Sequence, residues 1–326
     1  MAKRNTIFNE VTYKTVLKAN IDILEDYTLE MESNGKAEKT VYQYRADIKM
    51  FFCWVHDKAR NVNVLELKKR DFRNFFLELQ KSGASSSRVN RVQCSLRNLL
   101  EYCVEDDDYY EEYEINVMKS IKGMQKEEVR EIHFLTDDQV MLIMDHLIEL
   151  KKYQKALYLA ISYESAGRRN EVFQINKENF VAGKMTNEVI GKRNKKFKLL
   201  YFNKSRELAE LYLEQRGEDN IPELWTTGKG DKKIPAKYET LYQWTVSFRD
   251  ILEKKTGIRT DINPHSFRHT SLNNYNNGTH YVLKELGVEK LDLKILKALA
   301  NHSDISTTEG YLPNRDEEML AEAFKL

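Results

Sequence analysis

The sequence NPHSFRHT, residues 263–270, is the stretch from which the rest of this chain can be interpreted. It places His265 and Arg268 three residues apart, directly after Pro264. Because proline disfavours helix in the residue before it and is tolerated in a first helical turn, we expect a helix to begin here. By itself this pattern is more often an ion pair or a buried hydrogen bond than a catalytic group.

Three further segments hold side chains of related chemistry. NHSDISTTEGY, residues 301–311, ends in a tyrosine nine residues after its histidine. Toward the N-terminus, IGKRNKKFK (residues 190–198) places a lysine in a predicted hairpin turn, and SAGRRNEV (residues 165–172) presents an arginine after a buried helix. With the first stretch, they supply six candidate catalytic residues: Arg168, Lys192, His265, Arg268, His302 and Tyr311.

These side chains are the groups that metal-free attack on a phosphodiester needs. Charge grows on the non-bridging oxygens during attack, and the guanidiniums of Arg168 and Arg268 can neutralise it through paired hydrogen bonds. A phenol has a reference pKa of about 10, so Tyr311 needs cations and a proton acceptor beside it to act as a nucleophile. We expect His265 to accept that proton and Lys192 to protonate the departing 5′ oxygen.

In order and spacing, the segments resemble those of the tyrosine recombinase (phage integrase) family. The family's arginine followed three residues later by glutamate matches Arg168 and Glu171, and its GKxNK turn matches residues 191–195. Its HxxRHT motif is present at residues 265–270, and its last histidine and tyrosine have the spacing found here. Each match alone is weak, but independent matches in one order reinforce each other. The resemblance implies an enzyme that breaks and rejoins DNA.

The resemblance also implies how the reaction proceeds. The tyrosine would form a 3′-phosphotyrosyl link and release a 5′ hydroxyl, and the hydroxyl of the partner strand would reverse this step. Because bond energy is conserved, no cofactor is expected. Glu171 is expected to support Arg168, and His302 to donate a hydrogen bond to the phosphate. The expected partner is double-stranded DNA, bound by a dimer or tetramer of the chain.

The fold class implied by the resemblance is mainly α with a small β-sheet. It combines an N-terminal helical core-binding (SAM-like) domain with a mixed α/β catalytic domain. The chain length favours two domains, and apolar spacing predicts four N-terminal helices, at residues 21–33, 39–58, 64–83 and 85–103. We predict an N-terminal tail (1–18), a core-binding domain (19–115), a linker (116–134) and a catalytic domain (135–326).

Two local patterns shape the predicted catalytic domain. Thr136 and Gln139 predict a capped helix at its start. Residues 187–190 and 197–202 predict the two strands of a hairpin that carries Lys192 at its turn.

Charge is nearly balanced, with 52 Lys plus Arg against 51 Asp plus Glu and a net charge of +1. This value is low for a nucleic-acid-binding protein, so binding requires basic residues gathered on particular faces. Solubilising charge is the alternative interpretation of these residues. The residues predicted to contact DNA are Lys39, Arg45, Arg88, Arg91, Lys119, Lys122, Lys195 and Lys196.

Other features bear on compartment and cofactors. Three cysteines in apolar helical stretches favour reduced core thiols and the cytoplasm of a bacterium or of a phage-infected cell. The basic start is followed by no apolar signal region, and no run approaches the ~20 apolar residues of a membrane span. The scattered histidines and cysteines predict no metal site, and no phosphate-binding loop for ATP is present.

Three departures from the family pattern, together with the low net charge, leave open what the chain does with this motif set. The family's TGxR is SAGR at residues 165–168, the glycine before its last histidine is Asn301, and residues 271–300 form a longer connection than we expect. Residues 316–326 predict an amphipathic helix that either folds back on its own domain or docks on a neighbouring protomer. The alternatives are a DNA-binding repressor that retains the fold without strand exchange, and a type IB topoisomerase.

Overall fold

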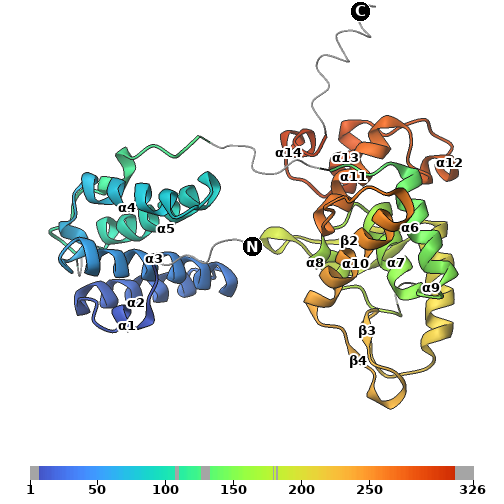
Figure 1. Ribbon diagram of the computed structural model, residues 1–326, viewed down its shortest axis with the longest axis horizontal. Helices are drawn as coiled ribbons and strands as arrows, with labels where there is room; N and C mark the ends of the chain where they lie inside the picture. Colours follow the sequence, from blue (N-terminus) through green and yellow to red (C-terminus); the bar gives the residue numbers. More distant parts are fainter. Residues whose placement is uncertain (1–6, 107–109, 126–132, 179, 181–182, 313–326) are drawn as a thin grey trace, which may run out of the picture. The chain divides into compact units, whose positions relative to one another are not determined.

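The chain folds into two compact units, residues 1–131 and 132–326, and each is described by itself. The computed structural model describes residues 7–106, 110–125, 133–178, 180 and 183–312 (Figure 1). Within these ranges both units are mainly helical, and the short strands belong to the second unit. The predicted fold class is confirmed.

Four long helices form the first unit around one apolar core. Phe51 is fully buried, and its ring centroid lies 5.1 Å from that of Phe72 and 4.8 Å from that of Phe75. Apolar residues at helical spacing therefore do meet in one core, as expected from the sequence. The elements are α1 (Glu10–Tyr13), α2 (Lys18–Ser33), α3 (Glu38–Lys58), η1 (Val64–Glu66), α4 (Lys69–Lys81), α5 (Ser86–Glu105) and η2 (Val117–Ser120).

The third predicted helix is divided in two. Asn63 accepts a hydrogen bond from the backbone N–H of Leu65 and begins η1, whereas Asp71 accepts one from the backbone N–H of Lys68 and begins α4. These caps favour a break near Leu67, although the apolar spacing continues across it. The short α1 lies in the segment predicted as an N-terminal tail.

The beginning of the predicted linker packs on the first unit. Met118 and Ile121 are buried in its core, and Arg97 of α5 donates hydrogen bonds to the carbonyl oxygens of both. Asn116 donates to the carbonyl of Arg97 in return. Residues 116–121 therefore form part of the wall of the first unit.

The second unit surrounds the buried helix α7. In α7 every residue from Ala156 to Glu164 is buried, so this helix can present the following turn in a fixed position. In Figure 1, α11, α13 and α14 lie at one end of the unit and β3 and β4 at the other. The elements are α6 (Asp137–Glu149), α7 (Tyr153–Glu164), α8 (Arg169–Phe173), β1 (Met185–Ile190), η3 (Lys192–Asn194), β2 (Lys196–Leu200), α9 (Asn203–Arg216), β3 (Thr226–Thr227), η4 (Gly230–Lys232), β4 (Ile234–Pro235), α10 (Tyr238–Thr256), α11 (Pro264–Asn277), α12 (Val282–Leu286), α13 (Leu293–Leu299) and α14 (Ile305–Glu309).

The predicted hairpin and the predicted cap are both present. Strands β1 and β2 pair antiparallel, with Val189 opposite Phe197, and the side chain of Thr136 caps α6 in a capping box with Gln139. The second strand ends earlier than predicted. The backbone N–H of Phe202 donates to the carboxylate of Glu164 at 2.7 Å, which removes it from the strand ladder and leads the chain into α9.

The long connection at residues 271–300 is a packed part of the second unit. It completes α11 and adds α12 and α13, whose Val282, Leu283 and Leu296 are buried together with Ala166 in one apolar cluster. The ring of His280 lies between those of Tyr275 and Tyr163, with centroid distances of 3.7 and 4.0 Å. This stack ties the connection to α7, the helix that precedes Arg168.

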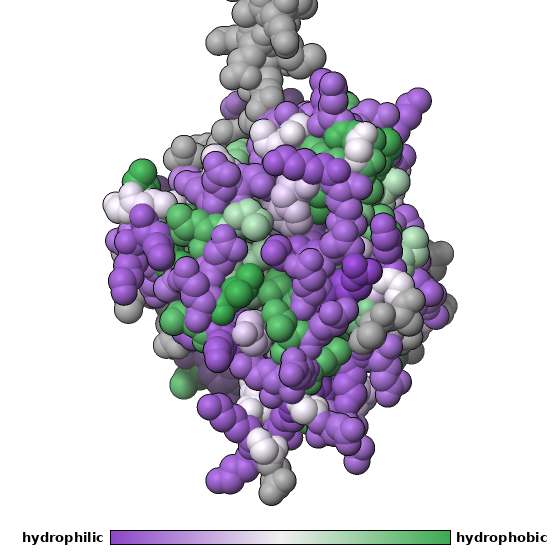
Figure 2. Space-filling view, turned by 90° about the vertical axis from the view of Figure 1, so that its right-hand side faces the viewer, coloured by the Kyte–Doolittle hydropathy of each residue, from purple (hydrophilic) through white to green (hydrophobic). Residues whose placement is uncertain are grey.

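The face of the molecule shown in Figure 2 is predominantly polar. On the face shown in Figure 2, hydrophilic residues surround small hydrophobic patches. None of the helices within the described residues is sufficiently long and apolar to span a membrane.

Candidate active site

The turn after α7 presents Arg168. Ala166 has φ +51°, a left-handed conformation that glycine adopts without strain and that the family's TGxR fills with glycine. Gly167 follows in a crowded position, because a Cβ atom there would lie 2.9 Å from both the Oγ of Ser165 and a methyl of Val172. SAGR therefore forms a tight turn, but with alanine at the left-handed position.

Glu171 fixes Arg168 from two sides. Its carboxylate accepts a hydrogen bond from the backbone N–H of Arg168 at 2.7 Å and another from the Nη1 of the same residue at 2.8 Å. Glu171 is 1 % exposed, so this ion pair is shielded from water on the carboxylate side. The expected pairing of Glu171 with Arg168 is present in the structure.

Arg268 lies beneath this turn in α11 and is 1 % exposed. Its Nη1 donates to the carbonyl of Ala166 at 2.6 Å and its Nη2 to the carbonyl of Ala300 at 2.5 Å. The Nη1 also lies 4.0 Å from the Glu171 carboxylate, so the two guanidiniums flank one acidic group. Burial and then the charge of Arg168 lower the pKa of Arg268 to about 10, which leaves it a cation at neutral pH.

His302 is held between Arg268 and α14. Its Nε2 lies 2.7 Å from the Nη2 of Arg268, which can only donate, so Nε2 is the acceptor. Its Nδ1 then donates to the hydroxyl of Thr308 at 2.9 Å. Burial, followed by the nearby Arg268, lowers the pKa of His302 to about 3. In this arrangement His302 is neutral. Its Nε2, the atom that we expect to face a phosphate, already accepts a hydrogen bond from Arg268.

Tyr311 follows α14 and is surrounded by the other candidates. Its ring centroid lies 4.4 Å from that of His269, 5.0 Å from that of His302 and 5.2 Å from that of His265. The guanidinium carbon of Arg268 lies 5.2 Å from the same ring. Four of the six predicted residues are therefore gathered around the Tyr311 ring, and Arg168 is joined to them through Glu171, which lies beside Arg268.

His265 is the exposed member of this group, at the start of α11. Partial desolvation, and then the nearby His269, Arg268 and Arg168, lower the pKa of His265 to about 4. A ring with this pKa is neutral at pH 7 and can accept a proton.

His269 is a residue to which we assigned no role from the sequence. Its ring stacks on Tyr311 at an interplanar angle of 27°, and its Nδ1 lies 3.3 Å from the Tyr311 carbonyl oxygen. The signal was available, because His269 directly follows Arg268 in the HxxRHT motif.

Lys192 lies in the turn of the hairpin, between β1 and β2. It is exposed in η3, directly after Gly191. A Cβ atom on Gly191 would lie 2.6 Å from the Phe197 ring and 3.3 Å from the Glu171 carboxylate. The base of the turn thus lies against the Arg168–Glu171 pair, and the lysine stem extends from that point.

Several residues predicted to contact DNA have protein partners. Arg91 donates two hydrogen bonds to the buried carboxylate of Asp47, at 2.9 and 3.1 Å. Lys119 pairs with Glu101 at 2.6 Å, Lys196 pairs with Glu188 at 3.3 Å, and Arg45 donates to Thr28. The Nε of Arg88 is buried without a partner among the described residues. The exposed members of the predicted set without an ion pair in the described part of the chain are Lys39, Lys122 and Lys195.

Two other predictions concern ligands and the C-terminus. Among the described residues, no group of three His, Cys, Asp or Glu side chains could hold a metal ion. The predicted amphipathic helix at residues 316–326 lies outside the described residues.

Comparisons with known proteins agree with the geometry. The sequence pattern described as "Phage integrase family" matches residues 133–318, more than half of the chain, and "Phage integrase, N-terminal SAM-like domain" matches residues 23–109. The chain belongs to the phage integrase family. It is a tyrosine-type site-specific recombinase of this family, as predicted.

Two relatives of this integrase match it over nearly the whole chain. The SPbeta prophage-derived recombinase-like protein YomM of Bacillus subtilis is 28 % identical over 306 residues, which cover 88 % of this chain and 86 % of the relative. The tyrosine recombinase XerA of Pyrococcus horikoshii is 26 % identical over 296 residues, which cover 90 % and 89 % of the two chains.

Two solved structures of similar fold also match nearly the whole chain. The XerH site-specific recombinase bound to a palindromic difH substrate has a TM-score of 0.67 at 14 % identity, over 93 % of this chain and 83 % of that one. The Tn1549 transposon integrase in complex with transposon right end DNA has a TM-score of 0.67 at 15 % identity, over 93 % and 98 %. At these identities, the likeness establishes the fold.

Proposed function

We propose that this integrase cuts and rejoins double-stranded DNA through a 3′-phosphotyrosine at Tyr311. The observation that carries the proposal is the gathering of three imidazole rings and the Arg268 guanidinium around the Tyr311 phenol, with Arg168 joined to Arg268 through Glu171. Guanidiniums placed beside a phenol favour the charged transition state of phosphoryl transfer and require no metal ion.

The proposed step forms one bond to phosphorus, breaks another and moves two protons. The Tyr311 oxygen bonds to phosphorus while its proton passes to His265, which is neutral at pH 7 because its pKa is lowered to about 4. The bond from phosphorus to the 5′ oxygen breaks, and Lys192 supplies the proton to that oxygen. The hydroxyl of the partner strand then reverses the step, so no free energy source is needed.

Because Arg268 is buried, the active site must rearrange before this reaction. A guanidinium that is 1 % exposed, lies against Tyr311 and donates to two carbonyl oxygens does not reach a DNA phosphate. We infer that Tyr311 and α14 shift when DNA binds, which would open Arg268 to the phosphate and release the Nε2 of His302. The expected donation from His302 to the phosphate would begin only then.

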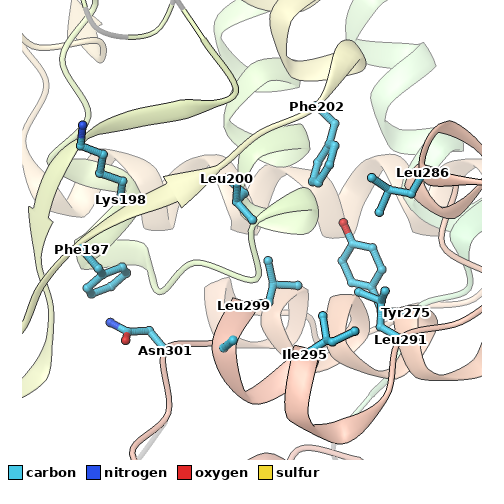
Figure 3. Close-up of a pocket in the computed structure, with 11 residues that line it drawn as sticks. Phe197, Lys198, Leu200, Phe202, Tyr275, Leu286, Leu291, Ile295, Leu299 and Asn301 are labelled. Carbon is cyan, nitrogen blue, oxygen red and sulfur yellow. The ribbon is translucent and has the colours of Figure 1, made fainter. Parts of the chain in front are cut away.

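We further propose that the integrase acts as a homo-oligomer on DNA. An apolar groove of about 450 Å³ lies between β2 and the α12–α13 region, and Leu200, Leu286 and Ile295 point into it (Figure 3). Leu286 and Ile295 are 41 % and 50 % exposed, which is unusual for leucine and isoleucine in one patch. The sequence of residues 316–326 would give a helix with one apolar side, and we propose that this segment covers the groove on a neighbouring protomer.

The proposed compartment is the cytoplasm of a bacterium or of a phage-infected cell. All three cysteines are free thiols, which suits a reducing environment; Cys53 and Cys103 are buried as expected, whereas Cys94 is exposed.

Covalent trapping tests the proposed reaction. The integrase is incubated in EDTA with a nicked duplex that carries the attachment sequence of its own element, so that the released strand diffuses away after cleavage. We expect a protein–DNA adduct that survives SDS. A strict requirement for Mg²⁺ would contradict the proposed chemistry, because Arg168 and Arg268 then would not suffice to neutralise the phosphate.

A further inference from the structure

Beside Arg168 lies a second arginine that the catalytic set does not include. We propose that Arg169 binds a DNA phosphate through its N–H edge while Tyr238 and Tyr242 hold the face of its guanidinium. This inference rests on the proposed function, because it requires that the integrase binds duplex DNA. It assigns a binding residue, and no part in the chemical step.

The geometry of the guanidinium is fixed by aromatic rings. The Cζ of Arg169 lies 3.9 Å from the ring centroid of Tyr238 and 5.5 Å from that of Tyr242. The two tyrosines are four residues apart in the first turns of α10, so they share one face of that helix. Tyr238 is itself held by Phe173 of α8, with ring centroids 5.5 Å apart at 80°.

The N–H groups of Arg169 form no hydrogen bond within the described part of the chain. Among the described residues, no carboxylate, carbonyl or hydroxyl accepts a hydrogen bond from its guanidinium, although the side chain is half-buried. The neighbouring guanidiniums differ, since Arg168 pairs with Glu171 and Arg268 donates to carbonyl oxygens. The guanidinium of Arg169 is not among the buried groups without a partner in the described ranges, so its N–H edge faces solvent and is open to an acceptor on a ligand.

Phosphate is the ligand that this arrangement fits. Stacking uses the face of the guanidinium and leaves the N–H groups at its edge, and that edge matches two phosphate oxygens. Arg169 also follows Arg168 directly in the chain. Arg168 is held by Glu171 and Arg169 by Tyr238, so the two guanidiniums would contact different phosphates of one duplex.

A purely structural role is the competing explanation. Cation–π contacts contribute roughly 0.5–2 kcal/mol, so Arg169 could serve only to attach α8 to α10. The two roles differ in their dependence on salt. Each phosphate contact releases counterions and adds ~0.9 to the slope of log affinity against log salt, whereas an internal contact adds nothing.

The experiment measures binding of the full-length integrase to a fluorescein-labelled 40-base-pair duplex by anisotropy, at several salt concentrations. For Arg169→Gln we expect about tenfold weaker binding and a salt slope lower by about one. Arg169→Lys should keep the slope and lose part of the affinity. Tyr238→Phe should match the wild type, whereas Tyr238→Leu should weaken binding because the guanidinium loses its support. Arg259→Gln is the matched control, since Arg259 is exposed near the far end of α10 and pairs with Glu253.

The outcomes separate the inference from the proposed function. If wild type binds the duplex with a salt-dependent affinity and Arg169→Gln has the same slope, the inference is wrong, whatever happens to cleavage. If neither wild type nor Arg259→Gln binds duplex DNA, the proposed function fails and the inference fails with it. Thermal unfolding of each variant shows that the fold is retained, and Arg169→Lys decides the matter if Arg169→Gln does not fold.

Discussion

Gly167→Ala tests whether the turn that presents Arg168 is as tightly packed as the structure indicates. The added Cβ would lie 2.9 Å from the Ser165 Oγ, 2.9 Å from a Val172 methyl and 3.3 Å from a Leu199 methyl. The first two distances are shorter than van der Waals contact, so neighbouring atoms must move. Such overpacking costs typically about 1–3 kcal/mol.

The expected effects on stability and cleavage differ in kind. For a unit of this size, ~2 kcal/mol corresponds to a Tm lower by about 4–8 °C. Because Arg168 follows directly, a displacement on the order of 1 Å should slow cleavage about a hundredfold even in fully folded protein. The assay combines thermal unfolding with single-turnover cleavage of the nicked duplex at saturating protein and at a temperature well below the Tm.

Ala166→Gly is the matched control in the same turn. Glycine removes the strain of alanine at φ +51°, roughly 1–2 kcal/mol, but it also loses a buried methyl and gains unfolded-state entropy, each about 0.5–1 kcal/mol. These contributions nearly cancel, so we expect little change in Tm or cleavage. A wild-type Tm together with a wild-type cleavage rate for Gly167→Ala would refute the reasoning.

Three further predictions concern single groups. Lys192→Ala should slow cleavage strongly on an ordinary phosphodiester and much less on a substrate with a 5′-bridging sulfur, whose thiolate leaves without a proton; equal slowing would make the lysine a phosphate anchor only. The pH profile of kcat/KM should stay flat from pH 7 down to about 5 and fall as the pH approaches 4. The reason is that His265, whose pKa is lowered to about 4, is then protonated and cannot accept the Tyr311 proton. A fall centred near pH 6.5 would contradict this explanation. Asp219, held by Arg216, Lys233 and Lys177, has a pKa well below its usual value, so its contribution to stability is complete above pH ~4 and is lost as the pH falls further. Asp219→Asn should therefore lower the free energy of unfolding by about 3 kcal/mol at pH 7 and by less at pH 3, measured by urea denaturation, and an equal loss at both pH values would rule out the ionic explanation.

The local features of the catalytic unit could be predicted because short-range chemistry determines them. Asn301 replaces the family's glycine, and its φ of +52° is a left-handed conformation that asparagine tolerates better than most residues. The hairpin around Lys192 and the capping box at Thr136 follow in the same way from neighbouring residues. Each of these features depends on a short consecutive stretch of the chain, of which the hairpin at Met185–Leu200 is the longest.

Features that depend on distant partners were missed. Arg91 looked like a solvent-facing cation, but Asp47, 44 residues earlier, accepts two hydrogen bonds from it. The long connection at residues 271–300 could not be distinguished from a loop, because its His280 is held between two tyrosines, one of which is 117 residues earlier. The stacking of Arg169 on Tyr238 likewise joins two helices that are separate in the sequence.

The most direct test of the central claim is to find which residue carries the DNA. The trapped adduct is digested with protease, and the peptide that retains the nucleotide is identified by mass spectrometry. We expect the link on Tyr311, and no adduct with Tyr311→Phe, which should still bind DNA with nearly unchanged affinity; the control Tyr42→Phe, at an exposed tyrosine of α3, should form the adduct normally. An SDS-resistant adduct with Tyr311→Phe would contradict the assignment, and full biological function of that variant would favour a DNA-binding repressor over a recombinase.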